Sequence, residues 1–340
     1  MNPIVGAPDE AYAVPMLRTF ALWACTLIAC PVAAQEVPTP VVTEPADPLA
    51  EPPVDPLAEV LAFTDYDERM SVPVRLNGSG PYRFIIDTGA ERTVIAHQVA
   101  GMLRLAAGRT VNIAAMTGSS PAATVLIPSL EIDAVPRGLR IEAPSLDRAH
   151  LGADGLVGID SLAGSAVQID FEANEMHVAK ALRRRRASNP GEIVVRAKTL
   201  AGRLIVSDAF YAGKRIAVIL DTGTSVSIGN AKLLELVRKR STPLRPIHLT
   251  SVTGDVLMAE HHQVPRVTIG GAEFQHLGIA FADVAPFRRL GLDDRPALFL
   301  GMDAMRLFRK VRIDFANREV RFLLPRQSFR TASLIGTRMP

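Results

Sequence analysis

The sequence predicts a strand-rich protein made of two copies of one domain-sized unit. Four landmarks of the first half recur in the same order in the second half, which indicates an internal duplication. In each half a glycine turn lies between segments of β-favouring residues, a pattern typical of a hairpin. Residues 231–240 form the clearest predicted helix, with Leu233, Leu234 and Val237 on one face. We therefore expect many strands and few helices.

Composition limits the class of protein. The 340 residues are 48% hydrophobic and 21% charged, which suits two domains with cores and excludes a disordered or collagen-like chain. The longest apolar run, residues 20–34, contains Pro31 and is too short for a membrane helix, so we expect no span after it. Cys25 and Cys30 both lie in this run. An exported mature chain would therefore have no cysteine chemistry and no disulfide.

The N-terminus predicts export. Arg18, the apolar segment after it and the small residues 32–34 have the order of a secretory signal peptide, with Met16 as an alternative start of translation. Residues 27–30 also resemble a lipoprotein cleavage site, which would leave Cys30 lipidated. We expect an exported, periplasmic protein. Membrane contact is expected only in the alternative in which it is anchored through Cys30.

The chain divides by composition into six segments. They are a signal peptide (1–34), an acidic Pro-rich disordered linker (35–69), an N-terminal lobe (70–181), an inter-lobe linker with four consecutive arginines (182–192), a C-terminal lobe (193–325) and a tail (326–340). The lobes together are basic and the first linker is acidic. Because aromatic and basic residues do not interleave into a stacking surface, we expect no nucleic-acid partner.

The repeated landmarks include two Asp-Thr-Gly motifs. The matched pairs are 84–90 with 218–224, 116–118 with 252–254, 156–160 with 299–303, and 169–171 with 313–315. A single Asp-Thr-Gly is weak evidence, because a strand that ends in a turn stabilised by an aspartate gives the same letters. Two copies 134 residues apart in matched contexts are much stronger evidence, and they single out Asp87 and Asp221.

With these motifs the chain resembles aspartic peptidases of the pepsin and retropepsin kind over residues 70–325. The resemblance implies an all-β fold of two pseudo-twofold-related, retropepsin-like β-barrel lobes, with a central cleft and few short helices. It also implies one catalytic aspartate from each lobe, Asp87 and Asp221. The first motif is closer to the retroviral enzymes and the second to the pepsins. Because one chain carries both copies, we expect a monomer.

The chemistry of such a pair follows from electrostatics. Two carboxyl groups a few ångströms apart share one proton, so one acts as an acid and the other as a base. The residues expected to support them are the loop neighbours Thr88, Gly89, Ala90, Thr222, Gly223 and Thr224. Both threonine hydroxyls of the motifs are suited to bonding across to the opposite loop. We hypothesise that the Thr224 hydroxyl donates to Asp221 and makes Asp221 the more readily ionised partner.

Other segments are expected to complete the cleft. The two hairpins would be flaps over a polypeptide bound in an extended conformation, with Met116, Thr117, Gly118, Val252, Thr253 and Gly254 at their turns. Residues 281–296 lengthen the second repeat and could form a specificity loop. Ile159 and Met302 stand where retroviral enzymes carry arginine, so the support beneath the active-site loops must be built differently here.

The sequence therefore predicts an aspartic endopeptidase that cleaves periplasmic or envelope proteins with the pair Asp87 and Asp221. We expect no metal and no cofactor, because the pair itself activates the water. The alternative is a catalytically silent peptide-binding module of the same fold.

Overall fold

The computed structural model describes residues 59–62, 64–66, 69–114, 116–132, 138–181 and 191–325. The predicted signal peptide, most of the acidic linker, the four arginines and the tail lie outside these residues. The chain divides into Met1–Asp47 and Pro48–Pro340, and every described residue belongs to the second unit. None of the helices in the described ranges has the length and apolar character needed to cross a bilayer.

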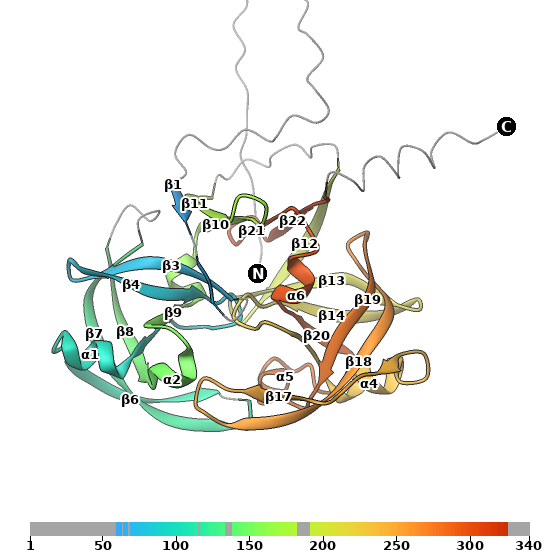
Figure 1. Cartoon of the computed structure of the whole chain (residues 1–340), viewed down its shortest axis with the longest axis horizontal. Coiled ribbons are helices and arrows are strands. Elements are labelled where there is room, and N and C mark those ends of the chain that lie inside the picture. The colour runs from blue at the N-terminus through green and yellow to red at the C-terminus, as the bar shows by residue number, and fades with distance from the viewer. Residues whose placement is uncertain are drawn as a thin grey trace, which may run out of the picture. The chain divides into compact units, whose positions relative to one another are not determined.

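The first lobe is an eight-stranded sheet that closes on itself (Figure 1). Its strands are β2 (Thr64–Tyr66), β3 (Arg69–Leu76), β4 (Ser79–Ile86), β5 (Val94–Ala96), β6 (Ala106–Ala114), β7 (Ser119–Ile132), β8 (Leu139–Leu146) and β9 (Gly155–Val157). They follow the order β2-β3-β4-β9-β5-β8-β7-β6, and β3 also pairs with β7, which closes the barrel. Three short helices belong to this lobe: α1 (His97–Met102), α2 (Arg148–Leu151) and α3 (Ile159–Leu162).

The second lobe repeats this arrangement. Its strands are β12 (Glu192–Leu200), β13 (Arg203–Tyr211), β14 (Lys214–Leu220), β15 (Ser227–Gly229), β16 (Thr242–Pro243), β17 (Ile247–Thr250), β18 (Val256–Ile269), β19 (Ala272–Phe281) and β20 (Ala297–Leu300). Its helices are α4 (Ala231–Val237), α5 (Ala285–Arg289) and α6 (Met302–Met305). A pairing of β13 with β18 closes this barrel as β3 with β7 closes the first.

The duplication is visible in strand register. In the first lobe β4 pairs in parallel with β9, with Ile86 opposite Val157, and in the second β14 pairs in parallel with β20, with Leu220 opposite Leu300. In both lobes the next strand, β5 or β15, is antiparallel to that partner. The predicted fold class is therefore confirmed: a mostly β chain of two related lobes with few short helices.

A shared sheet joins the two lobes. It adds β1 (Glu59–Ala62), β10 (Ser165–Asp170), β11 (Glu175–Lys180), β21 (Lys310–Asp314) and β22 (Glu319–Leu323) in the order β1-β11-β10-β21-β22-β12. The antiparallel pairing of β10 with β21 links the two halves directly. Lys310 Nζ lies 2.8 Å from Asp170 Oδ2 across that pairing, and both side chains are buried. A buried pair of opposite charges at matched positions of the two strands helps to fix the register of this sheet.

Strands extend past two of the predicted segment boundaries. Strands β1 and β2 lie in the segment that the sequence assigned to a disordered linker, and β12 begins at Glu192, the last residue of the predicted inter-lobe linker. The physical reason is backbone pairing: β1 adds to the edge strand β11, and β2 pairs with β3. An edge strand offers unpaired amide and carbonyl groups to a neighbouring segment.

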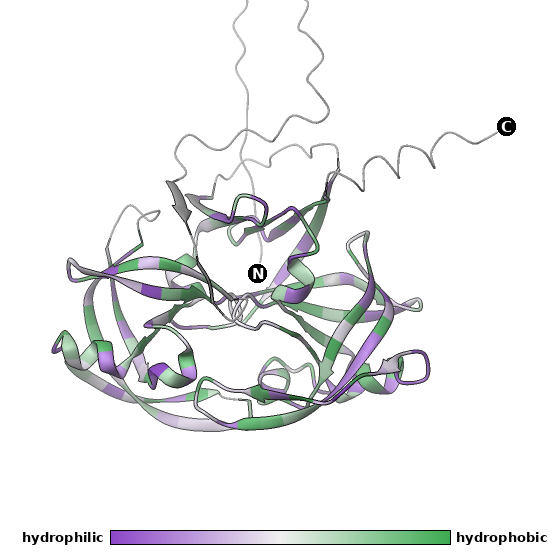
Figure 2. Ribbon diagram, viewed as in Figure 1, coloured by the Kyte–Doolittle hydropathy of each residue, from purple (hydrophilic) through white to green (hydrophobic). Residues whose placement is uncertain are grey.

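The core lies inside each barrel. Hydrophobic and hydrophilic residues alternate along the long strands, and buried and exposed positions alternate along β7 and β18 (Figure 2). The predicted helix is confirmed as α4, although it ends at Val237. Asn230 begins it, because its Oδ1 accepts a hydrogen bond from Leu233 N at 2.9 Å. Leu233, Leu234 and Val237 are its buried face.

Candidate active site

The two aspartates occupy equivalent places at the ends of buried strands. Asp87 follows β4 and Asp221 follows β14. The Asp87 amide donates to Val157 O and the Asp221 amide donates to Leu300 O, each at 3.0 Å. Because the strand residues before each aspartate are buried, the loops that carry the carboxyl groups start from fixed positions.

Reciprocal hydrogen bonds hold the two loops together. The Thr88 hydroxyl donates to Leu220 O at 3.0 Å and accepts from the Thr222 amide at 3.1 Å. The Thr222 hydroxyl donates to Ile86 O at 2.8 Å and accepts from the Thr88 amide at 3.1 Å. Both hydroxyls are buried, so the cross-loop bonds expected from the sequence are present and shielded from water.

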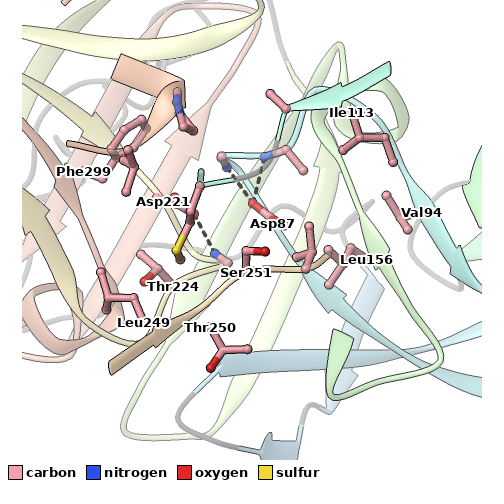
Figure 3. A pocket seen from close by; sticks show the side chains of 18 of the residues that line it. Asp87, Val94, Ile113, Leu156, Asp221, Thr224, Leu249, Thr250, Ser251 and Phe299 are labelled. Carbon is pink, nitrogen blue, oxygen red and sulfur yellow. Dashed lines mark hydrogen bonds between the residues drawn. The ribbon is translucent and has the colours of Figure 1, made fainter. Parts of the chain in front are cut away.

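Glycines allow the carboxyl groups to meet. A Cβ at Gly89 would lie 2.5 Å from Asp221 Cγ, and a Cβ at Gly223 would overlap the carboxyl group of Asp87. Each carboxyl group therefore packs directly on the backbone of the opposite loop. The Asp87 and Asp221 side chains hydrogen-bond each other, and Figure 3 shows them facing each other in the cleft.

The two carboxyl groups have different donors. Asp87 Oδ1 accepts from the amides of Gly89 at 2.9 Å and Ala90 at 2.8 Å, whereas Asp221 Oδ1 accepts from the Gly223 amide at 2.9 Å (Figure 3). Burial, and then the negative charge of Asp87, raise the pKa of Asp221 to about 7, although the Gly223 amide and the nearby Arg203 act in the opposite direction. The pair therefore shares one proton up to near neutral pH, and the smaller number of amide donors at Asp221 favours that residue as its site.

The hypothesis about Thr224 is wrong. Its hydroxyl donates to Val226 O at 3.0 Å instead of to Asp221. The physical reason is local: a threonine in a turn readily bonds a backbone group two residues on. The two backbone amides that donate to Asp87, against one that donates to Asp221, favour an asymmetry opposite to the expected one, with Asp87 the more readily ionised partner.

This asymmetry predicts a pH-dependent stability. Because the pKa of Asp221 is higher in the folded chain than its ordinary value of 3.8, the folded state binds more protons between about pH 4 and pH 7, and stability falls as pH rises through this window. We expect Asp221→Asn to raise the free energy of unfolding at pH 8 by about 1 to 2 kcal/mol relative to the wild type, and to leave it nearly unchanged at pH 4. Chemical denaturation at both pH values measures this, and an equal difference at the two would contradict it.

The supports beneath the loops are built from aspartates. Asp160 Oδ1 accepts from the Thr93 amide at 2.9 Å and from the Thr93 hydroxyl at 2.7 Å. In the second lobe Asp303 accepts in the same way from the amide of Ser227 at 3.0 Å and from its hydroxyl at 2.8 Å. The support expected beneath the active-site loops is therefore built here from Asp160 and Asp303. Neither Thr93 nor Ser227 stood out in the sequence, since a single hydroxyl residue carries no motif.

The carboxyl groups lie in a cleft of about 620 Å³ between the lobes. Its walls are mainly apolar and come from both lobes; they include Val94, Val111, Ile113, Leu156, Val226, Ile228, Leu249 and Phe299 (Figure 3). The sequence did not predict that Glu91, Arg203, Arg289 and His150 also line it. Arg203 crosses between lobes: its Nε donates to Gly89 O at 2.6 Å and its guanidinium bonds Glu91 at 2.8 Å.

Both predicted hairpins are present, β6–β7 and β17–β18. Of the six turn residues expected to bind substrate, Met116 and Val252 line the cleft; Thr117, Gly118, Thr253 and Gly254 do not. The Thr253 hydroxyl donates to Asp255 at 2.8 Å, and this hydrogen bond and then the Thr117 hydroxyl lower the pKa of Asp255. Thr117 and Asp255 come from different hairpins, so the two tips lie close to each other.

The sequence of the chain also matches a known protein family. The chain matches the sequence model of the aspartyl protease family over residues 72–161 and 208–304, more than half of its length. The chain belongs to the aspartyl protease family. Each match contains one Asp-Thr-Gly motif, so the two regions of this aspartyl protease correspond to its two lobes. A comparison with curated proteins found no match. In the described ranges no three His, Cys, Asp or Glu side chains gather to hold a metal ion.

Proposed function

We propose that this aspartyl protease is an endopeptidase that hydrolyses peptide bonds with Asp87 and Asp221. The observation that carries the proposal is the contact between two carboxyl groups, one from each copy of the motif, at an apolar cleft. Such an arrangement gives one acid and one base at the same pH. Membership of the aspartyl protease family supports peptidase activity, and the contact between Asp87 and Asp221 indicates which residues perform it.

The difference in hydrogen bonding between the two carboxyl groups indicates which one is the base and which one is the acid. Asp87, held by two backbone amides, is ionised and takes a proton from a bound water as that water attacks the peptide carbonyl. Asp221 holds the shared proton and donates it to the developing oxyanion. When the tetrahedral intermediate collapses, the C–N bond breaks and the proton on Asp87 passes to the leaving nitrogen. As the new carboxyl product forms, one hydroxyl group of the intermediate returns its proton to Asp221, so both carboxyl groups recover their starting states.

The cleft favours an extended polypeptide substrate with apolar side chains next to the scissile bond. Aliphatic residues flank the pair on both sides, and burial of an apolar side chain there removes its surface from water. The two hairpins, whose tips lie close together, would cover the bound strand.

We further propose that the enzyme acts as an exported monomer on periplasmic or envelope proteins. The signal-like N-terminal sequence supports export, and the presence of both motifs in one chain supports a monomer. Anchoring through Cys30 remains the alternative route to the same compartment.

A peptide library tests the proposed activity. The purified wild type and Asp221→Asn are each incubated with a mixed peptide library near neutral pH, and new termini are identified by mass spectrometry. We expect internal cuts flanked by apolar residues with the wild type and none with the variant. A folded wild type that cuts no peptide would contradict the proposal and favour the silent peptide-binding module. Cuts that persist unchanged in the variant would contradict the assignment of Asp221.

A further inference from the structure

Arg289 is a cleft residue that the dyad chemistry does not use. It is the last residue of α5, in the segment 281–296 that lengthens the second lobe. Pro286 and Arg289, three positions apart and so on one helix face, line the cleft. Arg288 lies on another face, where its guanidinium is 3.5 Å from Asp283, and it does not line the cleft.

Helix α5 holds Arg289 in a defined position. Phe287 is fully buried and packs against Phe299, with 4.8 Å between ring centroids. The Ala285 amide donates to Met116 O at 2.8 Å, which ties the start of the helix to the tip of the first hairpin. The helix is thus fixed by its own lobe and by the opposite one, so its cleft-facing side chains are presented to a bound chain from a stable base.

Arg289 shares its neighbouring carboxylate with a second arginine, Arg203. Its nearest anion is Glu91, with 3.9 Å between Arg289 Nη2 and Glu91 Oε2. The other Glu91 oxygen already bonds Arg203 at 2.8 Å, so one carboxylate faces two guanidinium groups. Within the described residues Arg289 has this long ion pair and no side-chain hydrogen bond, and its side chain is 49% exposed. Its donors are therefore available to an incoming carboxylate.

The Arg289 guanidinium lies at the rim of the cleft. Glu91 also lines a second, neighbouring hollow, which places the Arg289–Glu91 contact at the boundary between the two. The same cleft also has the apolar walls around Asp87 and Asp221. A substrate side chain that reaches Arg289 therefore meets a charged part of the cleft lining and not its apolar walls.

We propose that Arg289 is a specificity-determining residue that binds an acidic side chain of the substrate. The proposal rests on the proposed peptidase function and names a class of substrate for it. A glutamate or aspartate carboxylate accepts hydrogen bonds from the planar guanidinium, often two at once. Because the site is half exposed, the attraction is screened by salt, and we expect a preference of about 10-fold in kcat/KM at low ionic strength.

Matched peptides test the proposal. A peptide that the wild type cuts is made in a pair that differs only by glutamate or glutamine at the preferred acidic position. The ratio of kcat/KM for the two is measured in low and high salt for the wild type, Arg289→Ala, Arg289→Gln and Arg288→Ala. We expect a ratio of about 10 for the wild type at low salt, a smaller ratio at high salt, and a ratio near 1 for both Arg289 variants. Arg288→Ala, on the same helix, should keep the wild-type ratio.

The outcomes separate this inference from the function on which it rests. A wild type that cuts peptides without acidic preference at any position would overturn the inference and leave the peptidase function standing. The same holds if a folded Arg289→Gln keeps the wild-type ratio. A wild type that cuts no peptide would contradict both the inference about Arg289 and the peptidase function. A merely structural role for Arg289 would lower the rate on both peptides equally and leave the ratio unchanged, which also overturns the inference.

Discussion

Asp87→Asn and Asp221→Asn should each lower kcat/KM for peptide cleavage by about 10³-fold or more. An amide has the shape of a carboxyl group but neither takes a proton from water at neutral pH nor carries the proton that Asp221 holds. The loss should be of similar size in the two variants, because acid and base act in one proton relay. Steady-state kinetics on a peptide that the wild type cuts measures it.

A matched control separates chemistry from folding. Asp294 is an exposed aspartate, 4.0 Å from Arg295 and outside the cleft, so Asp294→Asn should keep wild-type activity. Both dyad variants should unfold at or above the wild-type temperature near pH 8, where the shared proton is being lost. A folded Asp87→Asn or Asp221→Asn with more than a tenth of the wild-type activity would contradict the assigned roles.

Gly223→Ala should lower kcat by about 10²-fold or more, because the added Cβ would overlap the Asp87 carboxyl group. The carboxyl group cannot move aside without leaving the two amides that hold it, at Gly89 and Ala90. Gly89→Ala should act in the same way on Asp221, since its Cβ would lie 2.5 Å from Asp221 Cγ. We expect both variants to fold with lower stability and to show the loss in kcat.

Gly101→Ala is the control for these substitutions. Gly101 lies in α1, where a new Cβ would meet nothing within 4 Å, so this variant should keep wild-type activity and gain slightly in stability. Wild-type kcat in a folded Gly223→Ala would show that the carboxyl groups do not need their close approach.

The elements that the sequence predicted correctly are those that local pattern determines. The two Asp-Thr-Gly loops recur 134 residues apart, and the hydrogen bonds between Thr88 and Thr222 have this same separation. Glycine turns between β-favouring residues located both hairpins, and the spacing of apolar residues located α4. These features depend on turn chemistry and residue spacing, which the sequence displays directly.

The remaining features depend on contacts between distant parts of the chain. Arg203 meets Glu91 from the other lobe, 112 residues earlier, and no pattern near either residue indicates that contact. The same holds for the pairing of β10 with β21 and for the turn of α5 that brings Arg289 into the cleft. The error about Thr224 has a different source: the residue type was suitable, but the backbone turned its hydroxyl toward Val226 O.

The pH dependence of kcat/KM for wild type, Asp87→Asn and Asp221→Asn tests most directly whether the two carboxyl groups share a catalytic proton. We predict that wild-type activity rises from acid pH and falls near pH 7, where the proton on Asp221 is lost, and that each variant stays at background at every pH. A wild-type activity without either ionisation, or a folded single variant that keeps the wild-type profile, would contradict the shared proton and the cleavage mechanism built on it.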